Sequence, residues 1–312
     1  MIWIIGAGSM AKEYVSVLKY LDIPFIVIGR GEISAKKLTA ETGEKVITGG
    51  IDKFISSGPQ KPDAAIIAVS VEELSSTTLS VVKYGVRKIL VEKPLCLFKN
   101  ELELIAKACL ENASKVFIAY NRRFFNSTKL TRQIIEEDGG VTSFSFEFTE
   151  WSHIIEPLKK NPTVKERWAL ANSSHVMDLA FHLCGKPSEM CCMHSGSLKW
   201  HQNASRFSGA GKAGDTLFSY SADWDAPGRW GIEVMTAKRR IVMRPIETVQ
   251  IQEKGKIALI PTECKDQYEE KFKPGLMRQI EAFISSDEKF LCHLDEYTNN
   301  FDIFCKIAGY KP

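Results

Sequence analysis

The sequence of 312 residues lacks any apolar run of about 18 residues, which is the length that a membrane-spanning helix requires. It has no internal repeat and no long polar linker of the kind that joins flexible modules. An apolar, strand-like stretch begins at the second residue and leaves no room for an N-terminal signal peptide. We therefore expect a cytoplasmic protein without a membrane partner.

The chain also has little excess charge and no Cys-x-x-Cys pair. Its 41 basic and 38 acidic residues give a net charge of +3, which does not indicate a nucleic-acid partner. The eight cysteines of a cytoplasmic chain predict free thiols rather than a disulfide framework. Cys191 and Cys192, with Cys184, His182 and His194 nearby, suggest a metal site, but buried apolar cysteine is the commoner state and zinc ligands are usually spaced more tightly. We expect no metal.

A dinucleotide-binding pattern is present at the start of the chain. Met1–Ile5 is an apolar strand, Gly6–Ala11 reads Gly-Ala-Gly-Ser-Met-Ala, and residues 12–19 are helical in pattern. The first glycine permits a tight turn, the second lets the backbone approach a pyrophosphate, and the helix N-terminus offers N–H groups to the phosphates. The cofactor ligands predicted here are Gly6, Gly8, Ser9 and Met10.

The second strand, Phe25–Ile28, carries information about which dinucleotide binds. Chains that bind NAD usually place an acid at this strand end, where it holds the ribose 2′-hydroxyl. Here the strand ends in Gly29-Arg30-Gly31, and an arginine pairs with a 2′-phosphate. We predict NADP with Arg30 as a ligand, although Glu32 keeps NAD as an alternative and an exposed surface arginine would look the same. Val69 and Ser70, which follow the next buried strand, are expected at the same cofactor.

Strands and helices alternate up to about Tyr120, which predicts a doubly wound parallel sheet, a Rossmann domain over residues 1–120. The expected strands cover 64–69, 89–91 and 116–119. The expected helices cover 34–42, 70–84 with a Ser70–Glu73 capping box, and 101–110 capped by Asn100.

Residues 121–312 differ in pattern and predict an α+β domain with a large, mainly antiparallel open sheet. Thr142–Glu150 alternates strictly, with Phe144, Phe146 and Phe148 on one face. Five further strands are expected at 216–221, 230–236, 240–243, 248–252 and 257–260, and helices at 128–137, 174–183 and 276–284.

The run Ile89–Val91 ends abruptly in Glu92-Lys93-Pro94. A continuous apolar run of this kind is typical of a strand buried on both faces of a parallel sheet. Because such sheets bind their ligands beyond the carboxyl ends of the strands, Lys93 is expected in the ligand crevice, and Glu92 is expected to position it or to bind the cofactor ribose.

Four segments together resemble the Gfo/Idh/MocA family of oxidoreductases: Gly6–Ala11, Glu92–Pro94, Tyr120–Phe124 and Asn172–Pro187. The resemblance implies an NAD(P)-dependent enzyme acting on sugars, sugar derivatives or cyclitols. It places Lys93 between nicotinamide and substrate, often before a cis bond to Pro94. It also implies a homodimer or homotetramer formed through the C-terminal sheet.

The resemblance further implies a catalytic histidine near the start of a helix in the second domain. The family pattern His-x-x-Asp, read back from Gly185-Lys186-Pro187, favours His175, with His182 as the competing choice. Related enzymes carry an aspartate four residues before this histidine, where this chain has Ala171 followed by Asn172. Asn172 either replaces that aspartate or caps the helix.

These residues predict a reaction at a carbinol or ketone carbon. His175 exchanges the hydroxyl proton while hydride moves to or from nicotinamide, and Lys93 stabilises the developing alkoxide. Asn121 and Arg123 follow the last strand of the first domain and are expected to bind substrate, as is Trp168 as a wall of the site. The alternative is a dinucleotide-binding regulator of the same fold without turnover, which the missing aspartate motivates.

Overall fold

The computed structural model describes residues 1–264, 266–285 and 287–311. The chain divides into two compact units. Unit 1 consists of Met1–Asn121 and Glu270–Thr298, and unit 2 of Arg122–Glu269 and Asn299–Pro312. The boundary expected after residue 120 agrees with the first of these divisions, but the sequence did not indicate that Glu270–Thr298 would also belong to unit 1. Among the described helices, none is both long and apolar enough to cross a membrane.

Unit 1 contains a sheet in which seven described strands run in the order β15-β6-β5-β4-β1-β2-β3. All neighbouring pairs are parallel except β15–β6. This is the predicted doubly wound sheet with one antiparallel strand added at its edge. The strands are β1 (Ile2–Ile5), β2 (Phe25–Ile28), β3 (Val46–Ile47), β4 (Ala64–Ile67), β5 (Lys88–Val91), β6 (Lys115–Ile118) and β15 (Cys292–His293).

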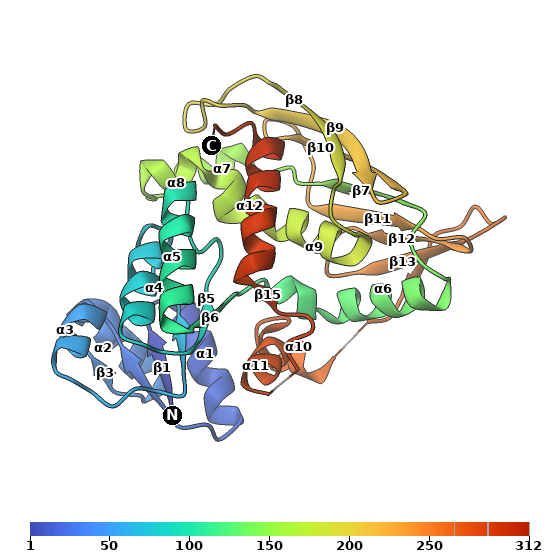
Figure 1. Cartoon of the computed structure of the whole chain (residues 1–312). Helices are drawn as coiled ribbons and strands as arrows, with labels where there is room; N and C mark the ends of the chain where they lie inside the picture. Colours follow the sequence, from blue (N-terminus) through green and yellow to red (C-terminus); the bar gives the residue numbers. More distant parts are fainter. Residues whose placement is uncertain (265, 286, 312) are drawn as a thin grey trace. The chain divides into compact units, whose positions relative to one another are not determined.

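Helices cover the sheet of unit 1. In Figure 1, α4 lies beside α5, and these two helices pack together, while α1 packs on α2 and α11. The helical segments are α1 (Ser9–Tyr20), α2 (Glu32–Thr42), α3 (Gly50–Ser56), η1 (Val71–Glu73), α4 (Leu74–Lys83), α5 (Lys99–Asn112) and α11 (Leu276–Ile284). Three further segments join the units: η2 (Asn121–Phe124), α10 (Gln267–Lys271) and α12 (Leu294–Ala308).

Unit 2 contains the second predicted sheet. Eight described strands run in the order β14-β13-β12-β11-β7-β10-β9-β8, and all pairs are antiparallel except β7–β10. The strands are β7 (Ser143–Glu147), β8 (Glu189–Ser195), β9 (Arg206–Ala213), β10 (Thr216–Asp223), β11 (Gly231–Met235), β12 (Arg239–Met243), β13 (Val249–Glu253) and β14 (Ile260–Thr262). The helical segments are α6 (Asn126–Glu137), α7 (Ser152–Ile155), α8 (Pro162–Glu166), η3 (Ala169–Ser173) and α9 (Ser174–Cys184).

One face of this sheet is covered by α9. The predicted aromatic stripe of β7 lies on that face, with Phe144 and Phe146 each 3% exposed. Phe181 of α9 packs edge-on against both rings and against Phe218 of β10. On β8, β9 and β10 the alternate side chains are exposed, including Leu217 at 58%. The alternation of β7 was therefore a correct indication of a sheet with one covered face.

Several local predictions were wrong. Ser70 makes no side-chain capping bond, because a 3₁₀ turn separates it from α4. Asn100 is not a cap either. Helix α5 begins at Lys99, and the carboxylate of Glu101 accepts the backbone N–H groups of Leu97 and Phe98. The last predicted strand lies at Ile260–Thr262 rather than at 257–260.

Candidate functional site

The glycine turn after β1 has the geometry that a dinucleotide requires. Gly6 has φ +126°, and a Cβ there would lie 2.2 Å from the carbonyl oxygen of Ala68, so only glycine fits. Gly8 is extended and caps α1, and a Cβ built on it would meet nothing within 4 Å. Ser9 and Met10 begin the helix, with Ser9 exposed. The turn thus leaves open space in front of the helix N-terminus, which fits a phosphate group.

This turn lies at the point where the strand order reverses, between β1 and β4. The close approach of Gly6 to Ala68 brings the segments after the two strands together. In the segment after β4, Val69 is half-buried and Ser70 is exposed. Open α/β sheets bind their ligands at such a switch point, so both residues lie where a cofactor is expected.

Arg30 lies at the end of β2, as predicted, and is exposed. Its Nη1 lies 3.0 Å from Oε2 of Glu73, which belongs to the 3₁₀ turn after β4. The guanidinium is therefore at the correct strand end for a ribose 2′-group and already has a carboxylate partner.

Glu92, Lys93 and Pro94 follow β5 at the same edge of the sheet. The Lys93–Pro94 peptide bond is cis, as the resemblance implied. Glu92 accepts a hydrogen bond of 2.7 Å from the Tyr14 hydroxyl of α1. Removal from solvent raises the pKa of Glu92, and the Tyr14 hydroxyl and the charges of Lys93 and Lys273 offset part of the rise. The carboxyl group thus connects the lysine segment to the first helix.

Lys273 is a residue that the sequence did not indicate. It lies in the part of unit 1 that returns late in the chain, and its Nζ is 2.9 Å from Sδ of Met10. The adjacent Phe272 packs edge-on against Tyr20 of α1, which fixes this segment along the helix. An exposed ammonium group therefore stands at the first turn of α1, beside the open space in front of Gly8.

Asn121 and Arg123 were both expected to bind substrate. Asn121 is buried and donates to the carbonyl oxygen of Pro274, 2.9 Å away. Arg123 is 2% exposed, and its Nε and Nη2 donate to the two carboxylate oxygens of Asp178 at 2.8 and 2.6 Å. This ion pair joins Arg123 to helix α9 in the core of unit 2, and substrate binding by Arg123 stays a prediction.

The two candidate histidines lie on α9 in different surroundings. His175 is in the first turn, 6% exposed, and its ring lies 6.2 Å from that of Trp230. His182 lies two turns further on. Burial and the charges of Arg123 and Arg132 lower the pKa of His182 to about 2. A histidine with such a low pKa stays neutral near pH 7 and is a poor proton acceptor. This favours His175 as the proton-transfer residue.

Asn172 lies in the π-helical turn η3 that leads directly into α9. Its Nδ2 donates to Oε1 of Glu150 at 2.9 Å, and the hydroxyl of Ser173 donates to the same oxygen at 2.7 Å. Glu150 follows β7 and is only 2% exposed. No sequence pattern singled out this carboxylate, since it lies 22 residues before Asn172.

Trp168 precedes η3 and is 8% exposed, packed edge-on against Trp200. Trp200 in turn stacks on Trp224 with ring planes 5° apart. The surroundings of Trp168 are thus those of a core residue, and its contact with substrate stays a prediction. No group of three or more His, Cys, Asp or Glu side chains suited to a metal occurs in the described part of the chain, and Cys191 and Cys192 are free on β8.

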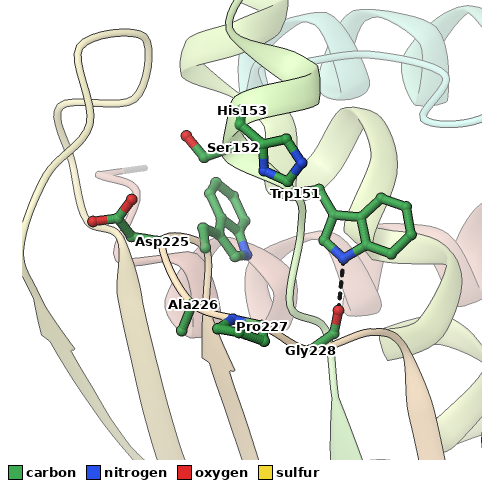
Figure 2. Close-up of a pocket in the computed structure, with 8 residues that line it drawn as sticks. Trp151, Ser152, His153, Asp225, Ala226, Pro227 and Gly228 are labelled. Carbon is green, nitrogen blue, oxygen red and sulfur yellow. Dashed lines mark hydrogen bonds between the residues drawn. The ribbon is translucent and has the colours of Figure 1, made fainter.

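A pocket of about 560 Å³ lies within unit 2. Figure 2 shows Trp151 and His153 at one side of it and the segment from Asp225 to Gly228 facing them. Trp151 is 45% exposed, and its Nε1 donates to the Gly228 carbonyl oxygen at 2.8 Å. A pocket lined by an exposed indole and by a carboxylate is suited to a ring that has one apolar face and hydroxyl groups at its edge.

Alternating aromatic and cationic groups connect this pocket with His175. The guanidinium of Arg229 lies 5.0 Å from the rings of both Trp151 and Trp230. Arg122 covers Trp230 at 4.9 Å, and the same indole lies beside His175. Each of these contacts is a cation–π or aromatic interaction that holds its members in place. A series of contacts within unit 2 therefore links the pocket to the buried His175.

No protein-family model matches the sequence, and no curated protein sequence matches it either. Solved structures resemble it over nearly its whole length. UDP-N-acetylglucosamine 3-dehydrogenase GnnA from Acidithiobacillus ferrooxidans matches with a TM-score of 0.75 at 14% identity, over 98% of this chain and 95% of that chain. Levoglucosan dehydrogenase in complex with NADH matches with a TM-score of 0.76 at 17% identity, over 99% and 95%. The WlbA dehydrogenase from Bordetella pertussis, in complex with NADH and UDP-GlcNAcA, matches with a TM-score of 0.75 at 14% identity, over 98% and 94%.

All three neighbours are named as dehydrogenases. At such low identity the likeness concerns the fold, and it agrees with the Rossmann sheet and the second, mainly antiparallel sheet described above. The chain therefore shares the fold of these three dehydrogenases, which confirms the predicted fold class.

Proposed function

We propose that this chain is an NAD(P)-dependent oxidoreductase that transfers a hydride between nicotinamide and a carbinol or ketone carbon of a sugar, sugar derivative or cyclitol. The observation that carries the proposal is the edge of the sheet in unit 1. The glycine turn, the segment after β4 and Lys93 all follow the carboxyl ends of neighbouring parallel strands. This edge therefore combines a phosphate cradle with a cation suited to a reacting oxygen.

The proposed cofactor is NADP, with NAD as the alternative. Gly6, Gly8, Ser9 and Met10 would hold the pyrophosphate, and Arg30 the adenosine ribose with its 2′-phosphate. Lys273, which approaches Met10, would add a positive charge at the pyrophosphate. Structures of two neighbours contain NADH, which supports a nicotinamide dinucleotide in this fold.

In the proposed reaction, the nicotinamide ring accepts or donates the hydride. His175 removes the hydroxyl proton of the carbinol during oxidation and returns it during reduction. The ammonium group of Lys93 hydrogen-bonds the same oxygen and stabilises its developing negative charge. Glu92, which is bonded to Tyr14, would keep Lys93 in position.

The substrate is proposed to extend from His175 towards the pocket at Trp151. Trp230 and Arg229 form a series of adjacent groups between the two. Trp151 would contact the apolar face of a ring, and Asp225 would accept hydrogen bonds from its hydroxyls. The neighbours named above include enzymes for a free anhydrosugar and for nucleotide sugars, so both kinds belong in a substrate panel.

We further propose that two or four copies assemble through the open face of the sheet in unit 2. On β8, β9 and β10 this face exposes small or apolar side chains, among them Cys191, Met193, Ala210 and Leu217. Contiguous exposed residues of this type are suited to packing against an identical face.

The proposal is tested by incubating the purified protein with NADPH or NADH and a panel of keto sugars, cyclitol ketones and nucleotide keto sugars. Stoichiometric loss of the reduced nicotinamide absorbance with one of them is the expected result. Lys93→Ala should then reduce kcat by roughly 100- to 1,000-fold, the usual effect of removing one electrostatic stabiliser, with dinucleotide affinity largely intact. Binding without consumption across the whole panel would instead support the regulatory alternative. Unchanged turnover in the variant would refute the role of Lys93.

A further inference from the structure

Glu150 is a buried carboxylate in unit 2 that accepts hydrogen bonds from two residues of the turn before His175. Its side chain follows β7 and is 2% exposed. Its Oε1 accepts from Asn172 at 2.9 Å and from Ser173 at 2.7 Å. A buried carboxylate lowers stability unless hydrogen-bond donors surround it, and Asn172 and Ser173 supply two such donors here.

The carboxylate determines which way the Asn172 amide points. A carboxylate accepts hydrogen bonds and cannot donate them, so the amide must turn its nitrogen towards Glu150. The carbonyl oxygen of Asn172 is then directed away from Glu150 as a fixed acceptor. Asn172 is half-buried, so part of this residue is exposed to solvent.

Asn172 and His175 lie three residues apart on one continuous helical segment. Residues at this spacing are neighbours on a helical surface. The hydroxyl of Ser174 donates to the Leu170 carbonyl oxygen at 2.7 Å, which ties the π turn to the start of α9. A change in the position of Asn172 is therefore transmitted directly to the histidine.

The location of His175 explains why a carboxylate is useful here. It lies in the first turn of α9, directly after the π-helical turn η3. Arg122 and Arg229, on the two sides of Trp230, add positive charge to the same region. The buried negative charge of Glu150, which is hydrogen-bonded to the turn before α9, opposes this positive charge.

We propose that Glu150 is a positioning residue for proton transfer: it orients the Asn172 carbonyl oxygen towards the substrate hydroxyl and balances the charge that forms on His175. In oxidation the hydroxyl proton moves to His175 and the hydride to nicotinamide, while Glu150 remains ionised. This inference rests on the proposed oxidoreductase function. Asn172 thereby has a defined role. Glu150, which follows β7, supplies the negative charge that the segment before His175 lacks.

The experiment compares kcat, KM and the thermal midpoint of three variants under conditions in which each is fully folded. Glu150→Gln keeps an acceptor for Asn172 and Ser173 but removes the charge, so kcat should fall roughly tenfold to 100-fold, as for small errors in catalytic geometry, with KM for the dinucleotide unchanged. Asn172→Asp places two carboxylates side by side and should also lower kcat. The double variant Glu150→Gln with Asn172→Asp reverses the hydrogen bond and restores one negative charge, so kcat should recover to within a few-fold of the wild type.

The matched control is Glu147→Gln. Glu147 is the last residue of β7, three residues before Glu150, and its carboxylate pairs with Arg244. Its kcat should equal that of the wild type. Equal kcat for Glu150→Gln and wild type, or a double variant no better than the single ones, would overturn the inference while leaving the oxidoreductase function intact. A wild-type protein without turnover on any substrate would overturn the proposed function and this inference with it.

Discussion

The guanidinium of Arg30 and the carboxylate of Glu73 form an ion pair, with 3.0 Å between Nη1 and Oε2. Arg30 follows β2 and Glu73 lies in the turn after β4, so the pair bridges the two segments on either side of the glycine turn. A bound 2′-phosphate would have to share Arg30 with Glu73. The ion pair therefore influences the choice between NADP and NAD.

Glu73→Gln is expected to shift the preference towards NADPH. Loss of the carboxylate frees the guanidinium and removes a repulsive charge, and an exposed ion pair of this kind corresponds to roughly a twofold to fivefold change in affinity. Titration of nicotinamide fluorescence with NADPH and NADH measures the ratio of the two dissociation constants. Arg30→Gln should move this ratio in the opposite direction. If both variants leave the ratio unchanged, Arg30 does not contact the ribose.

Lys273→Gln is expected to weaken dinucleotide binding by about tenfold to 100-fold, which is the usual range for loss of a hydrogen bond to a charged group. The cause would be loss of the ammonium group beside Met10 at the first turn of α1. Equilibrium binding of ADP-ribose measures the effect without any turnover. Binding of adenosine, which has no phosphate, should not change.

Lys271→Gln is the matched control for that measurement. Lys271 lies two residues away and covers the Tyr20 ring at 4.0 Å, so it shares the segment and the charge but not the approach to Met10. Its affinity for ADP-ribose should equal that of the wild type. A similar loss in both variants would indicate a general electrostatic effect rather than a phosphate contact.

The parts of the fold and site that sequence could predict depend on local patterns. The glycine turn and the Lys93 segment are each a short run of consecutive residues. A tight turn after a strand, or a lysine directly after a buried strand, can therefore be recognised from a few neighbouring residues. Lys273 and Glu150 could not be found in this way. Lys273 lies 263 residues after Met10, and Glu150 carries no motif, so only the tertiary fold brings them to their partners.

Strand β9 of unit 2 escaped prediction for a related reason. β9 contains Gly209 and Gly211, which weaken a strand pattern. A Cβ on Gly209 would lie 2.4 Å from the Tyr220 ring, and one on Gly211 would lie 2.1 Å from the Glu189 carbonyl oxygen. The glycines are thus required by neighbouring strands that the local sequence does not reveal.

His175→Ala and His182→Ala should differ sharply in activity. Removal of a proton-transfer group typically lowers kcat by about 100- to 10,000-fold, and this is expected for His175. His182, whose pKa burial lowers to about 2, is neutral throughout the assay range, so His182→Ala should act mainly on stability. Measurement of kcat with thermal midpoints for both variants separates the two roles. A larger loss of kcat in the folded His182 variant would show that the proton-transfer residue is misassigned.

Trp151→Ala is expected to raise KM for the sugar substrate by about tenfold with little change in kcat, because a large buried apolar contact corresponds to that range of free energy and lies away from the reacting carbon. Trp151 is the exposed wall of the pocket in Figure 2, so its removal should leave the core intact. Leu158→Ala, another exposed apolar residue after α7, is the control and should leave KM unchanged. Comparison of a short substrate with one that carries a second ring locates the contact. If KM rises equally for the two substrates, Trp151 contacts the reacting ring. If KM changes for neither substrate, the pocket does not bind substrate.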